Sequence, residues 1–161
     1  MIVLFRVDER LVHGQVAVAW CKTLKITHIV VANDQTAKSD LQIAALKMAA
    51  PNDVKISVQG LDNAVTVIND PRLADKRVML VVKNLEDALY MAKQVPDAKE
   101  VNLGNYGLLD NKSDRKPYSN YIRLDEQDIE CLKKIDAAAP IFVQVTPDRP
   151  KQLLDGFLKG G

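Results

Sequence analysis

Short apolar runs alternate along this chain with longer stretches in which apolar residues recur every three or four positions. The runs have the length and β-branched content of buried strands, and we predict strands at 2–7, 27–32, 54–59, 78–83, 100–103 and 141–145. Strands and helices that alternate in this way form strand–helix–strand units, whose right-handed crossovers build a mostly parallel sheet. We therefore expect a single α/β domain with three layers, in which helices cover both faces of a central sheet of six or seven strands.

Each predicted helix has an apolar side that can cover such a sheet. The apolar positions are Val16, Ala19, Trp20 and Leu24 in the helix 14–25; Leu41, Ala44, Ala45 and Met48 after the capping residue Ser39; Leu61, Ala64, Val65 and Ile68; Leu85, Ala88, Leu89 and Ala92; Ile129, Leu132 and Ile135 after Asp125; and Leu153, Leu154, Phe157 and Leu158 in a short helix after Pro150. Ligands of such folds bind at the carboxyl ends of the strands. The segment after the first strand lies at that edge.

Residues 6–15 read Arg-Val-Asp-Glu-Arg-Leu-Val-His-Gly-Gln and join the first predicted strand to the first predicted helix. A neutral imidazole carries a ring lone pair that can attack phosphorus, and a helix N-terminus offers unpaired N–H groups to phosphoryl oxygens. Gly14 lets the backbone come close, and Arg10 can donate two parallel hydrogen bonds to the phosphoryl group. Asp8 can orient Arg10 or the imidazole. The segment predicts a phosphoryl site with His13 as the nucleophile.

Simpler interpretations of the charged residues compete with this one. Arg6 and Arg10 could pair with Asp8 and Glu9 as a solvated charge cluster, and Gln15 could be only a first-turn helix residue. The strand-to-helix junction beside them favours the site over the charge cluster.

Two other functions would also use a histidine at this position. A histidine phosphatase carries an Arg-His-Gly sequence, but here Val12 precedes His13, which counts against that reading. A non-catalytic module of the same fold would use His13 only to bind an anion.

Residues 6–16 together with 17–20 closely resemble the signature of the enzyme IIB component of the bacterial phosphotransferase system (PTS), in its mannose/fructose/sorbose family. Segments 31–34, 49–51, 77–80, 101–104 and 145–150 are also similar to that family. The resemblance extends over nearly the whole chain. It implies that residues 1–161 form a single IIB domain.

The resemblance implies a phosphocarrier, a protein-Nπ-phosphohistidine–sugar phosphotransferase. His13 would accept a phosphoryl group at Nδ1 from the phosphohistidine of a IIA component and pass it to a sugar presented by the membrane components IIC and IID. The implied site consists of His13 and Arg10, the loop-supporting residues Arg6, Asp8, Gly14 and Gln15, and the lining residues Asn33 and Asp34. No metal or cofactor is implied. The sugar stays open among mannose, fructose, sorbose and amino sugars.

One segment departs from the family pattern. The family often has Gly-Gly-Met after the Asn-x-Gly of the fifth strand, whereas this chain continues with Asn-Tyr-Gly at 105–107. Tyr106, Tyr118 and Tyr121 in and after this segment could contact a partner or the sugar. We favour the alternative that they cover an edge of the sheet.

Composition restricts the partners and the location. Lys and Arg total 22 against 21 Asp and Glu, so the chain has no basic surplus of the kind that nucleic acid attracts. Its apolar runs are shorter than the roughly 20 residues that cross a bilayer, and its first residues do not resemble a secretory signal. We expect cytoplasmic residence, with membrane association only through IIC and IID. Cys21 and Cys131 are expected to be reduced packing residues, and His28 a structural histidine.

Overall fold

The computed structural model describes residues 1–110 and 112–160, and the predicted alternation of strands and helices is present in them. The elements are, in chain order, β1 (Ile2–Asp8), α1 (Gly14–Leu24), β2 (His28–Ala32), α2 (Asp34–Ala37), α3 (Asp40–Ala49), β3 (Lys55–Gln59), α4 (Leu61–Ile68), a 3-10 turn η1 (Pro71–Leu73), β4 (Val78–Val82), α5 (Leu85–Gln94), β5 (Val101–Asn105), β6 (Lys116–Pro117), β7 (Arg123–Leu124), α6 (Glu126–Ala138), β8 (Ile141–Val143), β9 (Gln152–Leu153) and α7 (Leu154–Lys159).

The described residues form one seven-stranded sheet in the order β3-β2-β4-β1-β5-β8-β9 and a separate small hairpin of β6 and β7. Every pairing in the large sheet is parallel except that of β8 with β9. The expected fold class is therefore confirmed. The inner strand β4 reads Val-Met-Leu-Val-Val and is buried along its whole length, as a strand covered on both faces requires.

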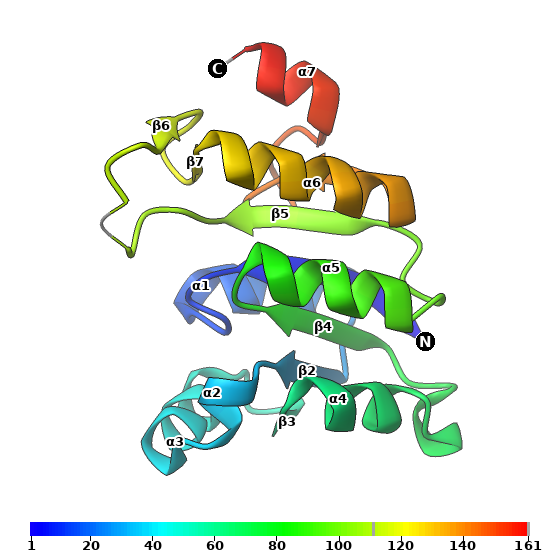
Figure 1. Ribbon diagram of the computed structural model, residues 1–161. Helices are drawn as coiled ribbons and strands as arrows, with labels where there is room; N and C mark the ends of the chain where they lie inside the picture. Colours follow the sequence, from blue (N-terminus) through cyan, green and yellow to red (C-terminus); the bar gives the residue numbers. More distant parts are fainter. Residues whose placement is uncertain (111, 161) are drawn as a thin grey trace.

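Helices cover both faces of the sheet (Figure 1), and each face has its own apolar cluster. On what we call the α1 face, Trp20 and Leu46 pack with Leu4, Ile29 and Met79. On the opposite face, which we call the α5 face, side chains of α4, α5, α6 and α7 pack with β-strand residues; they include Ala64, Leu85, Leu132 and Phe157, with Phe5, Leu80 and Leu103 from the sheet. This is the three-layer arrangement expected from the sequence.

The carboxyl end of β1 lies where the chain changes faces. The chain leaves β1 for α1 on one face, whereas the strands on either side of β1, β4 and β5, lead to α5 and α6 on the other. Connections that diverge in this way open a crevice at the carboxyl edge of a parallel sheet. The segment 9–13 is therefore at the edge where this fold binds ligands.

The apolar side of α3 was predicted wrongly. Leu41 and Met48 are 82% and 87% exposed, whereas Leu46 is 7% exposed and faces the core. The cause is that α3 carries apolar residues on most of its circumference, so spacing alone does not select the side that packs. Of the predicted apolar positions in α7, Leu154 and Phe157 are buried, but Leu153, just before the helix, is exposed.

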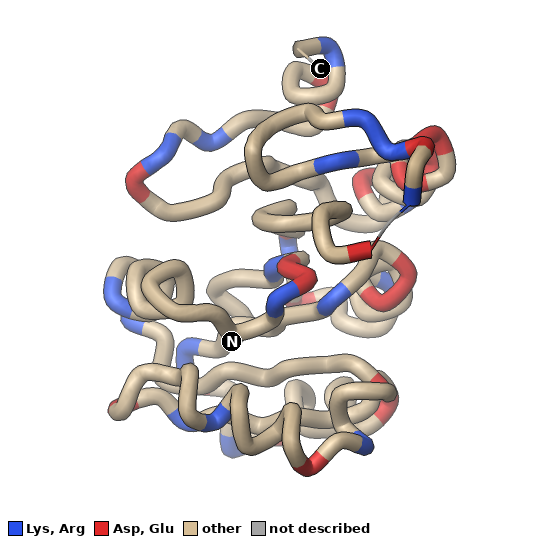
Figure 2. The backbone as a smooth tube through the Cα atoms, turned by 90° about the vertical axis from the view of Figure 1, so that its left-hand side faces the viewer, with Lys and Arg blue, Asp and Glu red and all other residues tan. Residues whose placement is uncertain are grey.

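The surface carries charges of both signs. Figure 2 looks onto the edge to which the parallel strands point, and basic and acidic positions are interspersed over its loops. No helix in the described residues is both long enough and apolar enough to span a bilayer.

Candidate functional site

His13 stands at the N-terminus of α1 with an exposed side chain. It is the N-cap residue of the helix, in an extended conformation, and in the described part of the chain its side chain makes no capping hydrogen bond. The N–H groups of the first turn precede any helical acceptor, so they are available to an anion. Gly14 has a φ of +43°, and no atom lies within 4 Å of the place where a Cβ would be. The imidazole therefore shares an open surface with unpaired main-chain donors.

Arg10 is also exposed and reaches back to the imidazole. Its Nη1 lies 3.2 Å from Nε2 of His13. An arginine N–H group can only donate, so Nε2 accepts this hydrogen bond and the proton of the neutral ring is on Nδ1. The pairing of Arg10 with His13 places a guanidinium directly beside the candidate nucleophile.

Buried neighbours hold the turn that carries these two side chains. Leu11 has a φ of +61°, an unfavourable conformation for a side-chain-bearing residue, and its N–H donates to the carbonyl of Asp8 at 2.8 Å. Leu11 and Val12 are 7% and 4% exposed and anchor the turn in the α1-face cluster. One oxygen of the Asp8 carboxylate accepts the backbone N–H of Arg10 at 3.0 Å. Asp8 thus orients the main chain of Arg10 rather than the imidazole.

Arg6 supports the turn from inside the protein. Its Nη2 donates to Oδ2 of Asp8 at 3.0 Å, and its Nη1 donates to Oδ1 of Asn102 at 2.6 Å and to the carbonyl of Gln144 at 3.2 Å. The guanidinium carbon lies 5.7 Å from the centroid of a Trp20 ring. Burial lowers the pKa of Arg6, and the Asp8 carboxylate opposes that shift. Arg6 and Asp8 form a buried ion pair, so the idea of a solvated charge cluster is wrong for them.

The close packing around Arg6 requires a glycine on β5. A Cβ at Gly104 would lie 2.2 Å from the guanidinium carbon of Arg6. Only a residue without a side chain fits there.

Asn33 and Asp34 lie at the carboxyl end of β2, and β4 separates that strand from β1. The Asn33 side chain accepts from the N–H and hydroxyl of Thr36 and donates to Asp87 at 2.8 Å. Asp34 accepts the backbone N–H of Leu61 at 2.8 Å. These contacts cap α2 and fasten the starts of α4 and α5. They place both residues at the same sheet edge as His13 but engage their side chains elsewhere.

Of the three tyrosines in the departing segment, Tyr106 is 5% exposed and belongs to the core, and Tyr118 packs against Phe157 with ring centroids 5.9 Å apart. Tyr121 packs against the apolar cluster of the α5 face. It also borders a hollow of about 320 Å³ at the end of β8, where the guanidinium carbon of Arg149 lies 5.8 Å from the ring centroid of Tyr121. The covering role is thus supported for Tyr106 and Tyr118.

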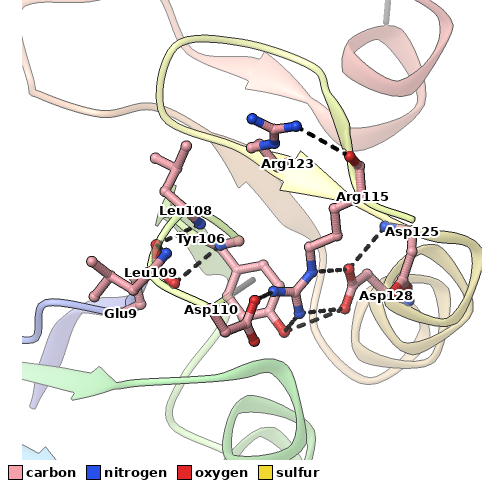
Figure 3. A network of polar contacts seen from close by, with 10 residues as sticks. Glu9, Tyr106, Leu108, Leu109, Asp110, Arg115, Arg123, Asp125 and Asp128 are labelled. Atoms are coloured by element: carbon pink, nitrogen blue, oxygen red, sulfur yellow. Dashed lines mark hydrogen bonds and ion pairs between the residues drawn. The ribbon is translucent and has the colours of Figure 1, made fainter. Parts of the chain in front are cut away.

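Sequence reasoning missed Glu9 as part of this site. Glu9 is 8% exposed, and its carboxylate accepts three backbone N–H groups, those of Gly107, Leu108 and Leu109 (Figure 3). Nothing in the local sequence signals this, because the donors lie 98 to 100 residues further along the chain. Gln15, by contrast, is where the sequence placed it, exposed in the first turn of α1.

Other candidate groups of the sequence lie apart from this turn. His28 begins β2, at the opposite edge of the sheet, where burial and the nearby Lys55 lower its pKa. Burial raises the pKa of the Cys21 thiol to about 11, so this cysteine is protonated near neutral pH. Burial also raises the pKa of Cys131. These environments agree with the packing roles expected for both cysteines.

The arrangement offers one nucleophile, one cation and several main-chain donors on an exposed turn. A tetrahedral dianion beside His13 would meet the guanidinium of Arg10 and the first N–H groups of α1, both of which stabilise negative charge. The site is open, so a second protein can approach the imidazole directly.

The known proteins to which this chain is similar all belong to one group. A family model described as "PTS system sorbose subfamily IIB component" matches residues 2–159. The chain is 39% identical over 156 residues to a probable phosphotransferase enzyme IIB component of Streptococcus pyogenes serotype M6, covering 94% of this chain and 95% of that protein. It is 33% identical over 137 residues to the mannose-specific EIIAB component of Escherichia coli K12, covering 85% of this chain and 42% of that protein. The crystal structure of the IIBSor domain of the sorbose permease from Klebsiella pneumoniae is similar with a TM-score of 0.88 and 28% identity, covering 99% of this chain and 96% of that one.

Proposed function

Because this chain belongs to the sorbose subfamily of PTS IIB components, which are sugar-transport phosphotransferases, we propose that it carries a phosphoryl group on His13. The group arrives from the phosphohistidine of a IIA component and leaves for a sugar that the membrane components IIC and IID present. The carrier is the whole domain, residues 1–161, and it works in the cytoplasm at the membrane through those partners.

The observation that carries the proposal is the exposed imidazole of His13 at the N-terminus of α1, 3.2 Å from the Arg10 guanidinium. A phosphoryl group on this ring gains from the helix dipole, the unpaired N–H groups and the arginine. An exposed ring is also required, because both the donor and the acceptor must reach the same nitrogen.

The contact between Arg10 and His13 suggests how the transfer starts. While Arg10 donates to Nε2, the ring proton is on Nδ1, and Nδ1 has no lone pair with which to attack. The incoming phosphoryl dianion attracts the guanidinium away from Nε2, since charge-assisted hydrogen bonds to phosphate are stronger than one to a neutral ring. The proton can then move to Nε2 through water, which leaves the Nδ1 lone pair ready.

In the transfer itself, the bond from phosphorus to the donor imidazole breaks as the bond to Nδ1 of His13 forms. The Nε2 proton of His13 becomes acidic and passes to solvent, while the departing donor ring takes up a proton. Arg10 and the first N–H groups of α1 stabilise the charge on the phosphoryl oxygens in the transition state. Arg6 and Asp8 act indirectly, because they hold the turn.

The similarity to a mannose-specific EIIAB component, whose name joins a IIA and a IIB part, supports a IIA component as the donor. The names of the relatives mention sorbose and mannose, and both stay candidates for the sugar here, as do fructose and amino sugars.

Phosphorylation of this protein by a phosphorylated IIA component tests the proposal. The chain has only two histidines, so His28→Ala is a matched control for His13→Ala. We expect an acid-labile phosphate on the wild type and on His28→Ala, and none on His13→Ala, with mass spectrometry locating the group. If His13→Ala is labelled as well as the wild type, or the wild type is never labelled, the carrier function is wrong. In the second case, phosphate binding without labelling would favour an anion-binding module.

A further inference from the structure

Glu9 connects the turn that carries His13 to a distant segment of the chain. Its Oε1 accepts the N–H of Gly107 at 3.1 Å, and its Oε2 accepts the N–H groups of Leu108 and Leu109 at 2.9 and 3.2 Å (Figure 3). Its own N–H donates to the carbonyl of Asn105 at 3.0 Å. The N–H of Glu9 is thus bound to the last residue of β5, and its carboxylate to the segment that follows β5. We call the three hydrogen bonds of its carboxylate the Glu9 clamp.

The clamp uses main-chain donors to stabilise a buried negative charge. Among the described residues no lysine or arginine forms an ion pair with Glu9, although a buried carboxylate is costly without compensation. Three consecutive N–H groups that converge on one carboxylate form an anion-binding nest, and such charge-assisted bonds are stronger than neutral ones. Glu9 is therefore placed by specific geometry rather than by general attraction.

The segment that donates these bonds is itself fixed. The N–H of Tyr106 donates to the carbonyl of Tyr121 at 3.0 Å, and the carbonyl of Tyr106 accepts the N–H of Arg123 at 2.9 Å. Gly107 has a φ of +89°, and a Cβ there would lie 2.0 Å from the carbonyl oxygen of Arg123. The nest therefore rests against the hairpin of β6 and β7 and cannot easily shift.

A buried cation completes the support. Arg115 is 4% exposed, and its Nε donates to Oδ2 of Asp128 at 2.8 Å while its Nη2 donates to the hydroxyl of Tyr106 at 2.9 Å. It also pairs with Asp110, directly after the donors of the clamp. This network ties the segment 106–110 to the start of α6.

The Glu9 clamp lies next to Arg10 and close to His13 along the chain. Arg10 follows Glu9 directly, and Asp8 on the other side holds the Arg10 N–H. The side chains of Arg10 and His13 are exposed, so the backbone of the turn and their contact with each other define where they point. Glu9 fixes that backbone from the β5 side, as Arg6 and Asp8 do from within β1.

From this geometry we infer that Glu9 is a positioning residue for phosphoryl transfer, acting through the clamp on the placement of Arg10 and His13. The inference rests on the carrier function proposed above. A merely structural Glu9 would change stability when replaced and leave the transfer rate of the folded protein unaltered.

The test uses Glu9→Gln and Glu9→Ala in the full chain, with Glu130→Gln as control. Glu130 is exposed on α6, and its replacement removes the same charge. Two phosphoryl donors are used, a phosphorylated IIA component and potassium phosphoramidate, whose P–N bond breaks as P–Nδ1 forms and ammonia leaves. Two-dimensional NMR of the N–H groups of 107–109 reports on the clamp independently of activity.

We expect Glu9→Gln to shift those three N–H signals and to lower the maximal labelling rate by roughly 10- to 100-fold, because small displacements of catalytic groups are that costly. The KM for the IIA donor should change little, and Glu130→Gln should match the wild type. Formate should restore part of the rate in Glu9→Ala, where the nest is empty, and none in Glu9→Gln, where the side chain fills it.

A second pair of variants breaks the clamp from the other side. Leu109→Pro removes one donor N–H, whereas Leu109→Ala keeps it, so the proline variant should be the slower of the two. This comparison stands even if the Glu9 variants fold poorly.

Two results overturn the inference. One is a wild-type labelling rate in folded variants whose 107–109 signals have shifted, and the other is the absence of any shift in those signals. If the wild type itself accepts no phosphoryl group from either donor, the carrier function fails and the positioning role falls with it. That outcome is distinct from a labelled wild type with equally active Glu9 variants.

Discussion

His13 and Arg10 owe their placement to buried residues that do not share their exposed surface. Their side chains are exposed, and what defines them is the turn held by the buried Leu11 and Val12 and by the Arg6–Asp8 ion pair. Substitutions of exposed residues rarely change stability by more than about 0.5 kcal/mol. Replacing an exposed side chain of this turn should therefore change activity without changing the unfolding free energy, and Arg10 is the residue on which we test this.

We expect Arg10→Ala to fold with an unfolding free energy within about 0.5 kcal/mol of the wild type. Transfer to the sugar should slow by about 100-fold, since a donor that stabilises transition-state charge is lost. Arg10→Lys should recover only part of the rate, because an ammonium cannot donate the paired bonds of a guanidinium. Urea unfolding and the rate of sugar phosphorylation in membranes containing IIC and IID measure the two effects. Wild-type transfer by Arg10→Ala would remove this arginine from the mechanism.

At the scale of elements, capping and periodicity explain most of the architecture. Ser39, Asn84 and Asp125 cap α3, α5 and α6 through their side chains, as their residue types favour. The apolar run of β4 forms an inner strand of the sheet, and the strands predicted from similar runs are all present. The two-residue strands and α2 were not predicted, because elements so short lack a periodic pattern. The buried side of α3 could not be read from its sequence, because its apolar residues surround the helix.

Gly104 tests the packing between β1 and β5. We expect Gly104→Ala to destabilise the fold by about 2 kcal/mol or more, because the new methyl group overlaps the Arg6 guanidinium. Gly156→Ala in α7 is the matched control, since a Cβ there meets no atom within 4 Å and alanine favours a helix by roughly 0.5–1 kcal/mol. Thermal and urea unfolding compare the two. Equal stability of both variants would contradict the close contact.

At the scale of the molecule, long-range contacts decide what the sequence could not reveal. The sequence predicted the three-layer fold and brought His13, Gly14 and Arg10 together, because these residues are neighbours in one turn. Asn102, Gln144 and the donors of the Glu9 clamp are distant in the chain, and they meet β1 only when the sheet has formed. Local sequence patterns contain no information about such long-range contacts. Glu9 therefore looked like an ordinary solvated acid.

The buried Arg115–Asp128 pair should make stability depend on pH. Burial alone would raise the pKa of Asp128, but its hydrogen bonds with Arg115 and the backbone lower it below the unfolded value of about 3.9. The unfolded carboxyl therefore binds its proton first as the pH falls. The stabilisation is complete above about pH 5 and is lost as the pH falls through the folded pKa.

Asp128→Asn measures this contribution. At pH 7 we expect it to cost about 3 kcal/mol, because the buried Arg115 charge loses its buried carboxylate partner and keeps only the exposed Asp110. The difference in unfolding free energy between Asp128→Asn and the wild type should become smaller at pH 3. Glu130→Gln on the same helix should have the same unfolding free energy as the wild type at both pH values. Urea unfolding at both pH values provides the comparison. A gap that is the same at both would contradict the pH dependence.

The strand order also has a consequence for biosynthesis. Among the seven strands of this sheet β1 is translated first, yet its neighbours in the sheet are β4 (Val78–Val82) and β5 (Val101–Asn105). While residues up to 77 emerge, Leu4, Phe5 and Val7 have no strand to pair with, although β2 and β3 can already join each other. Pairings of such high sequence separation form late and leave apolar surface open to nascent-chain chaperones. The turn that bears His13 is thus translated before both strands that flank β1, and it acquires its final shape only after they have joined the sheet.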